Sequence, residues 1–288
     1  MRYYDVIILG AGYSGLNAFY NIKNSNKIII SDKQYFNYYK SHGSVNINLK
    51  NVVNESVKKI DFSENILKTD MNEYSYKYLI IALGCSRENQ INFIDYIEKQ
   101  DNISLSSEND FDDYILIQEL FYLRSIGLNV KYHGSYLRFL GDRISYNIKS
   151  LMDENNIEFS EHYDYKMPEC RPNYIFNDFI KTDSKFRLND NVYAIGDIID
   201  SWPKLGELSM RQGRYVADLI NGKNYDFKPI FINIIDAYNG NALRIKSDLP
   251  WHGKIQKISK GHYVHYMKSF LHHYYKIRHG KMGFLIKI

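Results

Sequence analysis

The sequence predicts an α/β protein in which one doubly wound parallel sheet is interrupted by a second, smaller one and followed by an amphipathic helix. Three observations lead to this fold class. A buried strand, a glycine-rich turn and a helical pattern open the chain at residues 3–23. A second strand–helix–strand pattern occupies residues 103–132. A basic, aromatic segment with helical spacing closes the chain at residues 262–279.

The opening segment has the pattern of a dinucleotide-binding βαβ unit of a Rossmann-like domain. Gly10 permits a tight turn, Gly12 lets the backbone approach a pyrophosphate, and Gly15 lets the helix pack closely on the strand. The helix N-terminus stabilises the phosphate charge, and an acid about 20 residues past the glycines accepts the ribose hydroxyls. The full run is a strand at 3–9, then Gly10-Ala11-Gly12-Tyr13-Ser14-Gly15, a helix, and a strand at 27–31 that ends on Asp32.

The segment after Asp32 predicts a loop and then a meander of short strands. Residues 33–43, from Lys33 past His42, are rich in aromatic side chains and are expected to form a loop across the nucleotide site. Its aromatics belong either to the core or to the wall of that site. Period-two patterns predict strands at 57–61, beginning with Val57, and at 66–69, 73–76 and 78–84, the last containing Ala82 and ending in Gly84.

Four segments together resemble the flavin domain of the pyridine nucleotide–disulfide oxidoreductase superfamily. They are the βαβ unit, the meander, the strand ending Ala82-Leu83-Gly84, and Val192-Tyr193-Ala194-Ile195-Gly196-Asp197. The resemblance implies FAD in the first nucleotide site, with the aspartate of the last motif on the ribityl chain. Carried over to this sequence, the implied FAD contacts are Gly10, Ala11, Gly12, Tyr13, Ser14, Gly15, Asp32, Lys33, Val57, Ala82, Gly84, Gly196, Asp197, Lys204 and Leu205.

Within the superfamily, the chain most resembles sulfide:quinone oxidoreductase and type II NADH dehydrogenase. The resemblance rests on Asp32-Lys33 before an aromatic loop, Pro203-Lys204-Leu205-Gly206 before a helix, Lys228-Pro229-Ile230-Phe231 before a hairpin, and the basic C-terminus. A helix starting near Glu207 would point its positive end at the flavin pyrimidine, where negative charge gathers on reduction. The alternative is an ordinary loop followed by an amphipathic surface helix.

The middle of the chain departs from these relatives. In the superfamily a second βαβ unit with its own glycine motif binds NAD(P)H. Here the turn between the strand 103–107 and the helix 110–126 has no glycine and carries Glu108 and Asp110, which would repel a pyrophosphate. We therefore expect this reduced domain to persist without binding NAD(P)H tightly. The expected domains are a first FAD-binding part at 1–100, the degenerate domain at 101–167, a second FAD-binding part at 168–248, and a C-terminal membrane-surface segment at 249–288.

The two cysteines fit no zinc spacing, and no metal site is expected. Sulfide:quinone oxidoreductases carry a redox cysteine pair in the middle domain and ahead of the C-terminal hairpin, and this sequence has neither. Cys85 follows the Ala-x-Gly strand instead, and Cys170 lies in the returning crossover. Because the two crossovers run side by side in this fold, these cysteines are expected to be neighbours. They form either a redox pair or two separately buried thiols, and His42 is either a proton donor and acceptor or a structural residue.

The charge distribution singles out the C-terminus. The net charge is +4, but eight of the 37 Lys and Arg residues lie after Asp248, where no acid occurs, so residues 1–248 carry −4. An acid-free, basic and aromatic helix is typical of an anchor on anionic lipid. The alternatives are packing on the body or on a partner subunit, and nucleic-acid binding, which we do not expect. With a first strand at the N-terminus and no apolar run of spanning length, the expected location is peripheral, on the cytoplasmic face of a membrane.

These observations predict a flavoprotein that passes electrons from a small donor, best guessed as sulfide, through FAD to a membrane quinone. Cys85, Cys170 and His42 are the candidate catalytic residues. One alternative is an FAD-binding subunit of a larger complex without independent catalysis, which the degenerate middle domain favours. Another is an NADH:quinone oxidoreductase. A homo-oligomer or a partner subunit is compatible with all three.

Overall fold

The computed structural model describes residues 1–39 and 44–287, and its largest sheet is built on the opening strand. This seven-stranded sheet has the order β5-β2-β1-β8-β7-β6, with β15 paired to β8. The pairs β1–β2, β1–β8 and β8–β15 are all parallel, whereas β6, β7 and the first part of β8 form an antiparallel meander. The strands are β1 (Arg2–Leu9), β2 (Lys27–Ser31), β5 (Val53–Asn54), β6 (Val57–Asp61), β7 (Ile66–Thr69), β8 (Glu73–Ile81) and β15 (Val192–Ala194).

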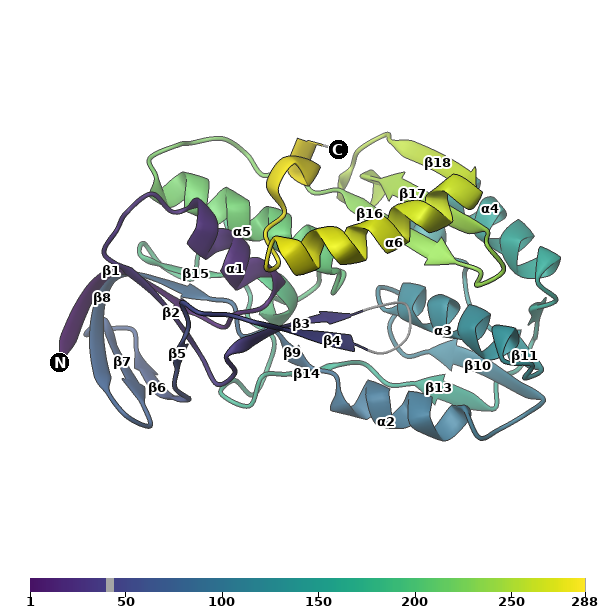
Figure 1. Cartoon of the computed structure of the whole chain (residues 1–288), viewed down its shortest axis with the longest axis horizontal. Coiled ribbons are helices and arrows are strands. Elements are labelled where there is room, and N and C mark those ends of the chain that lie inside the picture. The colour runs from purple at the N-terminus through teal and green to yellow at the C-terminus, as the bar shows by residue number, and fades with distance from the viewer. Residues whose placement is uncertain (40–43, 288) are drawn as a thin grey trace.

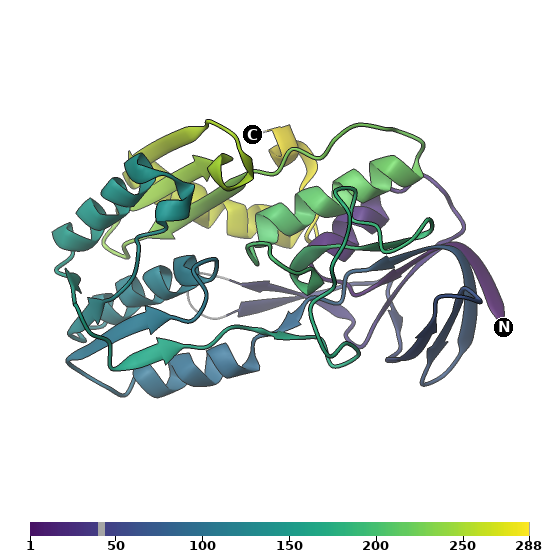
Figure 2. The same cartoon turned by 180° about the vertical axis from the view of Figure 1, so that it is seen from behind.

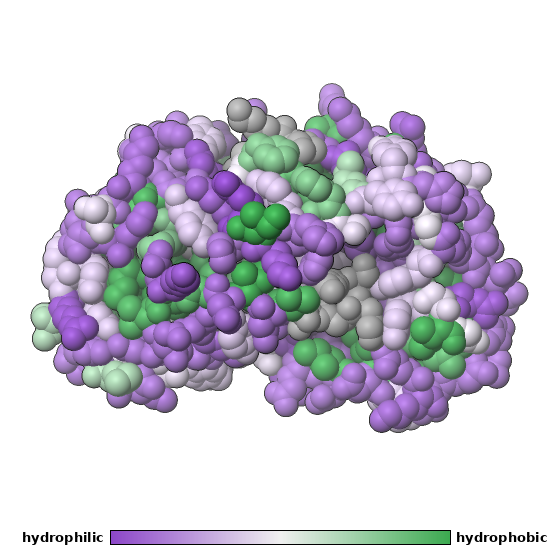
Figure 3. Space-filling model, in the orientation of Figure 1, coloured by the Kyte–Doolittle hydropathy of each residue, from purple (hydrophilic) through white to green (hydrophobic). Residues whose placement is uncertain are grey.

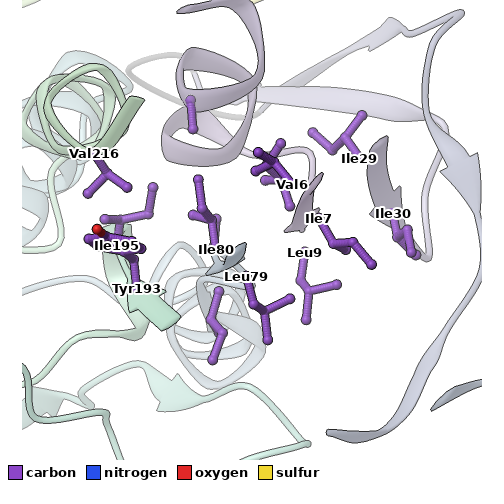
Figure 4. Packing of buried hydrophobic residues seen from close by; sticks show 14 of the residues in the cluster. Val6, Ile7, Leu9, Ile29, Ile30, Leu79, Ile80, Tyr193, Ile195 and Val216 are labelled. Atoms are coloured by element: carbon purple, nitrogen blue, oxygen red, sulfur yellow. The ribbon is translucent and has the colours of Figure 1, made fainter. Parts of the chain in front are cut away.

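The buried parts of the parallel strands are apolar except for Ser31, as expected where both faces of a sheet are covered. Helices α1 (Tyr13–Asn21) and α5 (Gly206–Ile220) pack against each other above it. Figure 4 shows side chains of β1, β2, β8 and β15 packed side by side, with Val216 of α5 beside Ile195. This core holds the ends of four strands together at the edge where α1 and α5 begin.

The contact between α1 and α5 depends on a glycine. A Cβ atom on Gly213 would lie 2.2 Å from the backbone carbonyl oxygen of Ser14, so the two helices could not approach as they do. We expect Gly213→Ala to lower the free energy of unfolding by about 1–3 kcal/mol, the usual cost of overpacking. Denaturant unfolding followed by circular dichroism measures this. The matched control is Gly12→Ala, whose Cβ would meet no atom within 4 Å. Equal stability of the two variants would contradict the packing argument.

A second, smaller parallel sheet lies at the opposite end of the molecule (Figures 1 and 2). Its order is β12-β11-β10-β13, and every pair in it is parallel. The strand–helix–strand pattern expected at 103–132 is confirmed here, and α2 and α4 are two further helices that were not predicted from the sequence. The elements are α2 (Glu88–Ile97), β10 (Ile103–Ser107), α3 (Asp113–Ser125), β11 (Val130–Tyr132), α4 (Asp142–Glu154), β12 (Glu158–Phe159) and β13 (Tyr165–Met167).

The C-terminal part is an antiparallel sheet with a helix laid across it (Figure 1). Strands β16 (Phe231–Asp236), β17 (Ala242–Ser247) and β18 (Gln256–Gly261) form the sheet, and α6 (His262–Ile277) starts directly where β18 ends. One face of this sheet joins the core of the middle region through Phe231, Ile235 and Leu243. Residue 248, the expected domain boundary, lies between β17 and β18 of this sheet. The domain boundaries stay predictions.

The prediction of a loop at residues 33–43 is wrong for residues 35–39. Residues 35–39 form β3 (Tyr35–Tyr39), which pairs antiparallel with β4 (Ser44–Asn48). The physical reason is a period-two pattern in which Phe36 and Ile47 pair across the ribbon and are both buried. The tyrosines around Phe36 suit a loop as well as a strand, and they hide this alternation in the sequence. His42 lies outside the described residues.

Candidate functional site

A single large cavity runs between the first sheet, α5, β16 and α6, with a volume of about 1270 Å³. Thirteen of the fifteen predicted FAD contacts line it, whereas Gly15 and Gly196 lie behind its wall in packing positions. The volume exceeds the ~300–1,000 Å³ of typical ligand pockets. The lining predicted residues are Gly10, Ala11, Gly12, Tyr13, Ser14, Asp32, Lys33, Val57, Ala82, Gly84, Asp197, Lys204 and Leu205.

The glycine-rich turn has the geometry of a phosphate cradle. Gly10 has φ +97°, and a Cβ atom there would lie 2.4 Å from the carbonyl oxygen of Ala82. A Cβ on Gly15 would lie 1.9 Å from the carbonyl oxygen of Gly10. A Cβ on Gly12, in contrast, would meet nothing within 4 Å and would project into open space. The first and third glycines are therefore required by packing, and the second leaves the backbone open to a ligand.

The opposite end of the cradle is organised by Asp197. Its Oδ1 accepts a hydrogen bond from Ser209 Oγ at 3.1 Å, and its Oδ2 forms an ion pair with Arg87 Nη2 at 3.1 Å. Arg87 also donates to the carbonyl oxygen of Lys204 at 2.9 Å. Sequence reasoning missed Arg87, because it stands outside the glycine motifs and only the fold brings it to Asp197. The carboxylate is thus held rigidly at the cavity wall.

Lys204 lies in the predicted turn, but its ammonium group points away from the expected ligand. Lys204 Nζ donates to the carbonyl oxygen of Ile199 and lies 4.0 Å from the ring centroid of Phe179. The N-terminal end of α5 also faces the cavity, and the helix begins at Gly206, one residue before the predicted start. A Cβ on Gly206 would press against the ring of Tyr13 at 3.1 Å. The turn therefore packs α5 end-on against the glycine-rich segment.

Several charged residues of the cavity wall have no counterpart in the motifs. Burial raises the pKa of Glu207 to about 7, although Arg211 forms an ion pair with it. Burial also lowers the pKa of Lys268 to about 8 and raises the pKa of Glu119 to about 8. Lys268 Nζ donates to Gln118 Oε1 at 2.6 Å. These groups come from α3, α5 and α6, so only the tertiary structure could reveal that they share one cavity.

The two cysteines lie in contact beside this cavity. Cys85 opens the short strand β9 (Cys85–Ser86), which pairs antiparallel with β14 (Arg171–Pro172) directly after Cys170. A hydrogen bond between the two thiols, followed by burial and the charge of Asp197, raises the pKa of Cys85. Cys85 lines the cavity, and Cys170 is 4% exposed. Both thiols are free. No group of three or more metal-ligating side chains occurs in residues 1–39 and 44–287.

The chain's own carboxylates occupy the start of α3. Gln90 Nε2 donates to Asp112 at 3.0 Å, and the Tyr132 hydroxyl donates to Asp113. Burial raises the pKa of Asp113 to about 7. A Cβ on Gly134 would lie 2.3 Å from the Tyr132 hydroxyl, so this ring also blocks the turn after β11. This is the helix end at which a second pyrophosphate would need free backbone N–H groups.

We expect no tight binding of NADH to this region. The side chains of Asp112 and Asp113 occupy the start of α3, and the absence of glycine prevents close backbone approach. The exposed acids Glu108 and Asp110 in the turn before it repel a pyrophosphate. Isothermal titration calorimetry with NADH and NADPH up to millimolar concentration should show no saturable binding. The neutralised variant Asp110→Asn serves as control, since it removes one exposed charge and leaves the turn closed. Micromolar binding to the unmodified chain would contradict this interpretation.

Helix α6 carries an exposed apolar stripe, defined here as Tyr263, Tyr266, Met267, Phe270 and Ile277. Its opposite face packs on the body through Val264 and Tyr275, which are buried. The side of the molecule on which α6 lies in front shows apolar and weakly polar side chains among hydrophilic ones (Figure 3). Met267 and Phe270 also line the cavity, which therefore opens beside the stripe. Within the described chain, no helix is both long and apolar enough to cross a bilayer.

Known proteins share this architecture. No protein-family model matches the chain. The chain is 31% identical over 94 residues to the dihydrolipoyl dehydrogenase of Buchnera aphidicola subsp. Baizongia pistaciae, a match that spans 32% of this chain and only 18% of that protein. The sulfide:quinone oxidoreductase of the hyperthermophilic bacterium Aquifex aeolicus superposes with a TM-score of 0.72 at 16% identity, covering 98% of this chain and 92% of that one. The NADH:rubredoxin oxidoreductase of Clostridium acetobutylicum gives 0.58 at 16% identity, covering 89% and 85%. At such identities the solved structures establish the fold.

Proposed function

We propose that this chain, which has the fold of the pyridine nucleotide–disulfide oxidoreductases, is an FAD-dependent oxidoreductase. The observation that supports this most strongly is one cavity with an open glycine cradle at Gly12 and carboxylates at Asp32 and Asp197. Backbone N–H groups at the start of α1 would hold the pyrophosphate, and Asp32 would accept the ribose hydroxyls. Asp197, fixed by Arg87, would accept the ribityl hydroxyls. FAD would supply the two-electron chemistry.

We further propose that the electron acceptor is a membrane quinone. A quinone stays in the bilayer, so its reductase must bring an apolar opening to the membrane surface. The cavity opens beside the exposed stripe of α6, and residues Met267, Phe270 and Phe284 belong to both the cavity wall and the exposed surface. Lys276, Arg278 and Lys281 follow on the same segment and favour anionic headgroups. This supports a peripheral location, proposed to be on the cytoplasmic face of a membrane.

Sulfide is the electron donor we propose. Sulfide is small enough to enter the cavity without a nucleotide site at the start of α3. Of the two solved structures compared above, the sulfide:quinone oxidoreductase gives the higher TM-score. Cys85 and Cys170 are the proposed catalytic residues on the donor side, together with His42 from the sequence. The closed start of α3 also supports a second candidate, an FAD-binding subunit of a larger complex.

One experiment tests these proposals. The purified protein is reconstituted with FAD, and the flavin absorbance near 450 nm is followed anaerobically after adding sulfide or NADH, with and without a short-chain quinone. We expect bleaching by sulfide and recovery on addition of quinone. Rapid bleaching by NADH would support an NADH:quinone oxidoreductase instead. Flavin that binds and that no donor reduces would support the subunit, and failure to bind FAD would overturn all three.

A further inference from the structure

A second, smaller cavity of about 320 Å³ lies between α1, β2, the segment 49–52 and the chain after α6. This volume is within the ~300–1,000 Å³ of typical ligand pockets. Its described lining residues differ from all those of the large cavity, so its ligand is independent of the proposed FAD function. The lining residues are Leu16, Phe19, Tyr20, Ile29, Leu49, Lys50, Asn51, Val52 and His279.

The inner part of this second cavity is apolar. Its buried lining residues are Leu16, Ile29, Leu49 and Val52. Phe19 and Tyr20 follow Leu16 by three and four positions, so all three lie on one face of α1. Both aromatic side chains are half-buried. The second cavity therefore offers an apolar chain a lining drawn from a helix, a strand and a loop.

The chain after α6 is fixed at the edge of the second cavity. The hydroxyl of Tyr20 donates to the carbonyl oxygen of His279 at 3.1 Å. Asn17, which is 1% exposed, donates to the carbonyl oxygen of Gly280 at 3.0 Å, and its Oδ1 accepts a hydrogen bond from the N–H of Met282 at 2.9 Å. His279 is thus held beside the apolar lining by hydrogen bonds to α1.

The surroundings of the second cavity are positively charged. Lys50 is exposed and belongs to the lining. Lys27 Nζ lies 4.9 Å from the ring centroid of Phe19, and Lys281 Nζ lies 5.7 Å from that of Tyr20. Burial, followed by the positive charge of Lys281, lowers the pKa of Lys27. None of the described lining residues is acidic, so an anion is favoured at this edge.

We propose that the second cavity binds an acyl chain that ends in an anionic group. The methylene groups would contact the apolar lining, and a carboxylate or phosphate would lie at the edge near Lys50 and Lys281. A free fatty acid and a membrane phospholipid both offer this chemistry. A neutral apolar molecule would leave the lysines without an anion, and a small anion would leave the apolar lining in contact with water.

Calorimetric titration of the full chain tests this proposal with three ligands, each below its critical micelle concentration. They are decanoate, decanol and a decanoyl lysophosphatidate. We expect decanoate to bind at least tenfold more tightly than decanol, because only the carboxylate is attracted by the lysines. From hexanoate upwards, affinity should rise about fourfold per methylene group until the cavity is full. Excess FAD should displace none of these ligands, because the two cavities have separate linings.

The outcomes separate the two sources of the chain. Binding of decanoate supports a free fatty acid as the ligand, and binding of the lysophosphatidate alone supports a membrane phospholipid. Failure of both to bind would overturn the proposal. Displacement of decanoate by FAD would place the acyl chain in the large cavity and would also overturn it.

Two variants test the position of the ligand. Lys50→Glu changes an exposed side chain, and we expect about tenfold weaker binding of decanoate with unchanged binding of decanol. Val52→Trp fills the cavity and should weaken both at least tenfold. The matched control is Lys58→Glu, an exposed lysine of β6 outside both linings, which should bind decanoate as the unmodified chain does. Equal decanoate affinity of Lys50→Glu and Lys58→Glu would contradict the proposal even if Val52→Trp does not fold.

Discussion

Replacing Gly12 with aspartate is expected to abolish FAD binding and to leave the fold intact. A Cβ at this position meets no atom within 4 Å, so the new side chain enters the cradle without disturbing the protein. Its carboxylate then faces the pyrophosphate. At about 4 Å, a pair of like charges near a protein surface costs about 4 kcal/mol, which weakens binding by more than a hundredfold. Quenching of FAD fluorescence on titration with the apoprotein gives the affinity, and thermal unfolding gives the stability.

The control for Gly12→Asp is Ser184→Asp, which adds the same charge at an exposed residue outside the cavity lining. We expect its FAD affinity to equal that of the unmodified protein. Gly12→Ala adds a methyl group without charge and should fall between the two. An FAD affinity of Gly12→Asp within threefold of the unmodified protein would show that the cofactor does not use this cradle.

Removing the aromatic stripe from α6 is expected to release the protein from lipid. Tyr266 and Phe270 are 70% and 52% exposed, so serine at both positions removes apolar surface without opening the core. Burying a Phe-sized side chain contributes about 1.5–3 kcal/mol, so the pair contributes about 3 kcal/mol, or roughly a hundredfold in partition. Sedimentation with vesicles containing a third of anionic lipid measures the bound fraction.

The matched control is Tyr146→Ser on α4, because Tyr146 is 74% exposed and lies outside the stripe. This variant should bind vesicles as the unmodified protein does. We also expect raised salt to weaken binding, since exposed cations are screened beyond a Debye length of ~8 Å at physiological ionic strength. Unchanged vesicle binding of the Tyr266→Ser/Phe270→Ser variant would rule out α6 as the anchor.

Local patterns predicted the first sheet because its strands carry their own signals. The glycine turn and the apolar runs of β1 and β8 follow from spacing and residue type, and the start of α5 follows from the family resemblance. The structure places β1 and the start of α5 within one residue of the prediction, whereas the two strands expected at 73–76 and 78–84 form the single strand β8, which ends at Ile81. Buried parallel strands are easily recognised because both faces are apolar. The α/β fold class was therefore predictable from the sequence.

The hairpin β3–β4 and the charged wall of the cavity were not predictable in the same way. The alternation around Phe36 is brief and mixed with tyrosines that suit either core or cavity. Arg87, Glu207 and Lys268 come from three distant segments, and no local spacing relates them. Their common surroundings arise from the packing of α5 and α6 around one cavity. Residues that only the tertiary structure brings together share no periodic pattern in the sequence.

The direct joint between β18 and α6 has a mechanical consequence. Gly261 ends the strand with φ +129°, and the helix starts at the next residue with no linker. No flexible linker therefore separates α6 from β18, and the orientation of the helix relative to the sheet is fixed. Adsorption through the exposed stripe would fix the tilt of the whole body relative to the bilayer normal, with the cavity opening facing the acyl chains. Binding of the protein to the membrane would thus also place the cavity opening at the bilayer. Neutron reflectometry on supported bilayers should find one orientation of the bound protein.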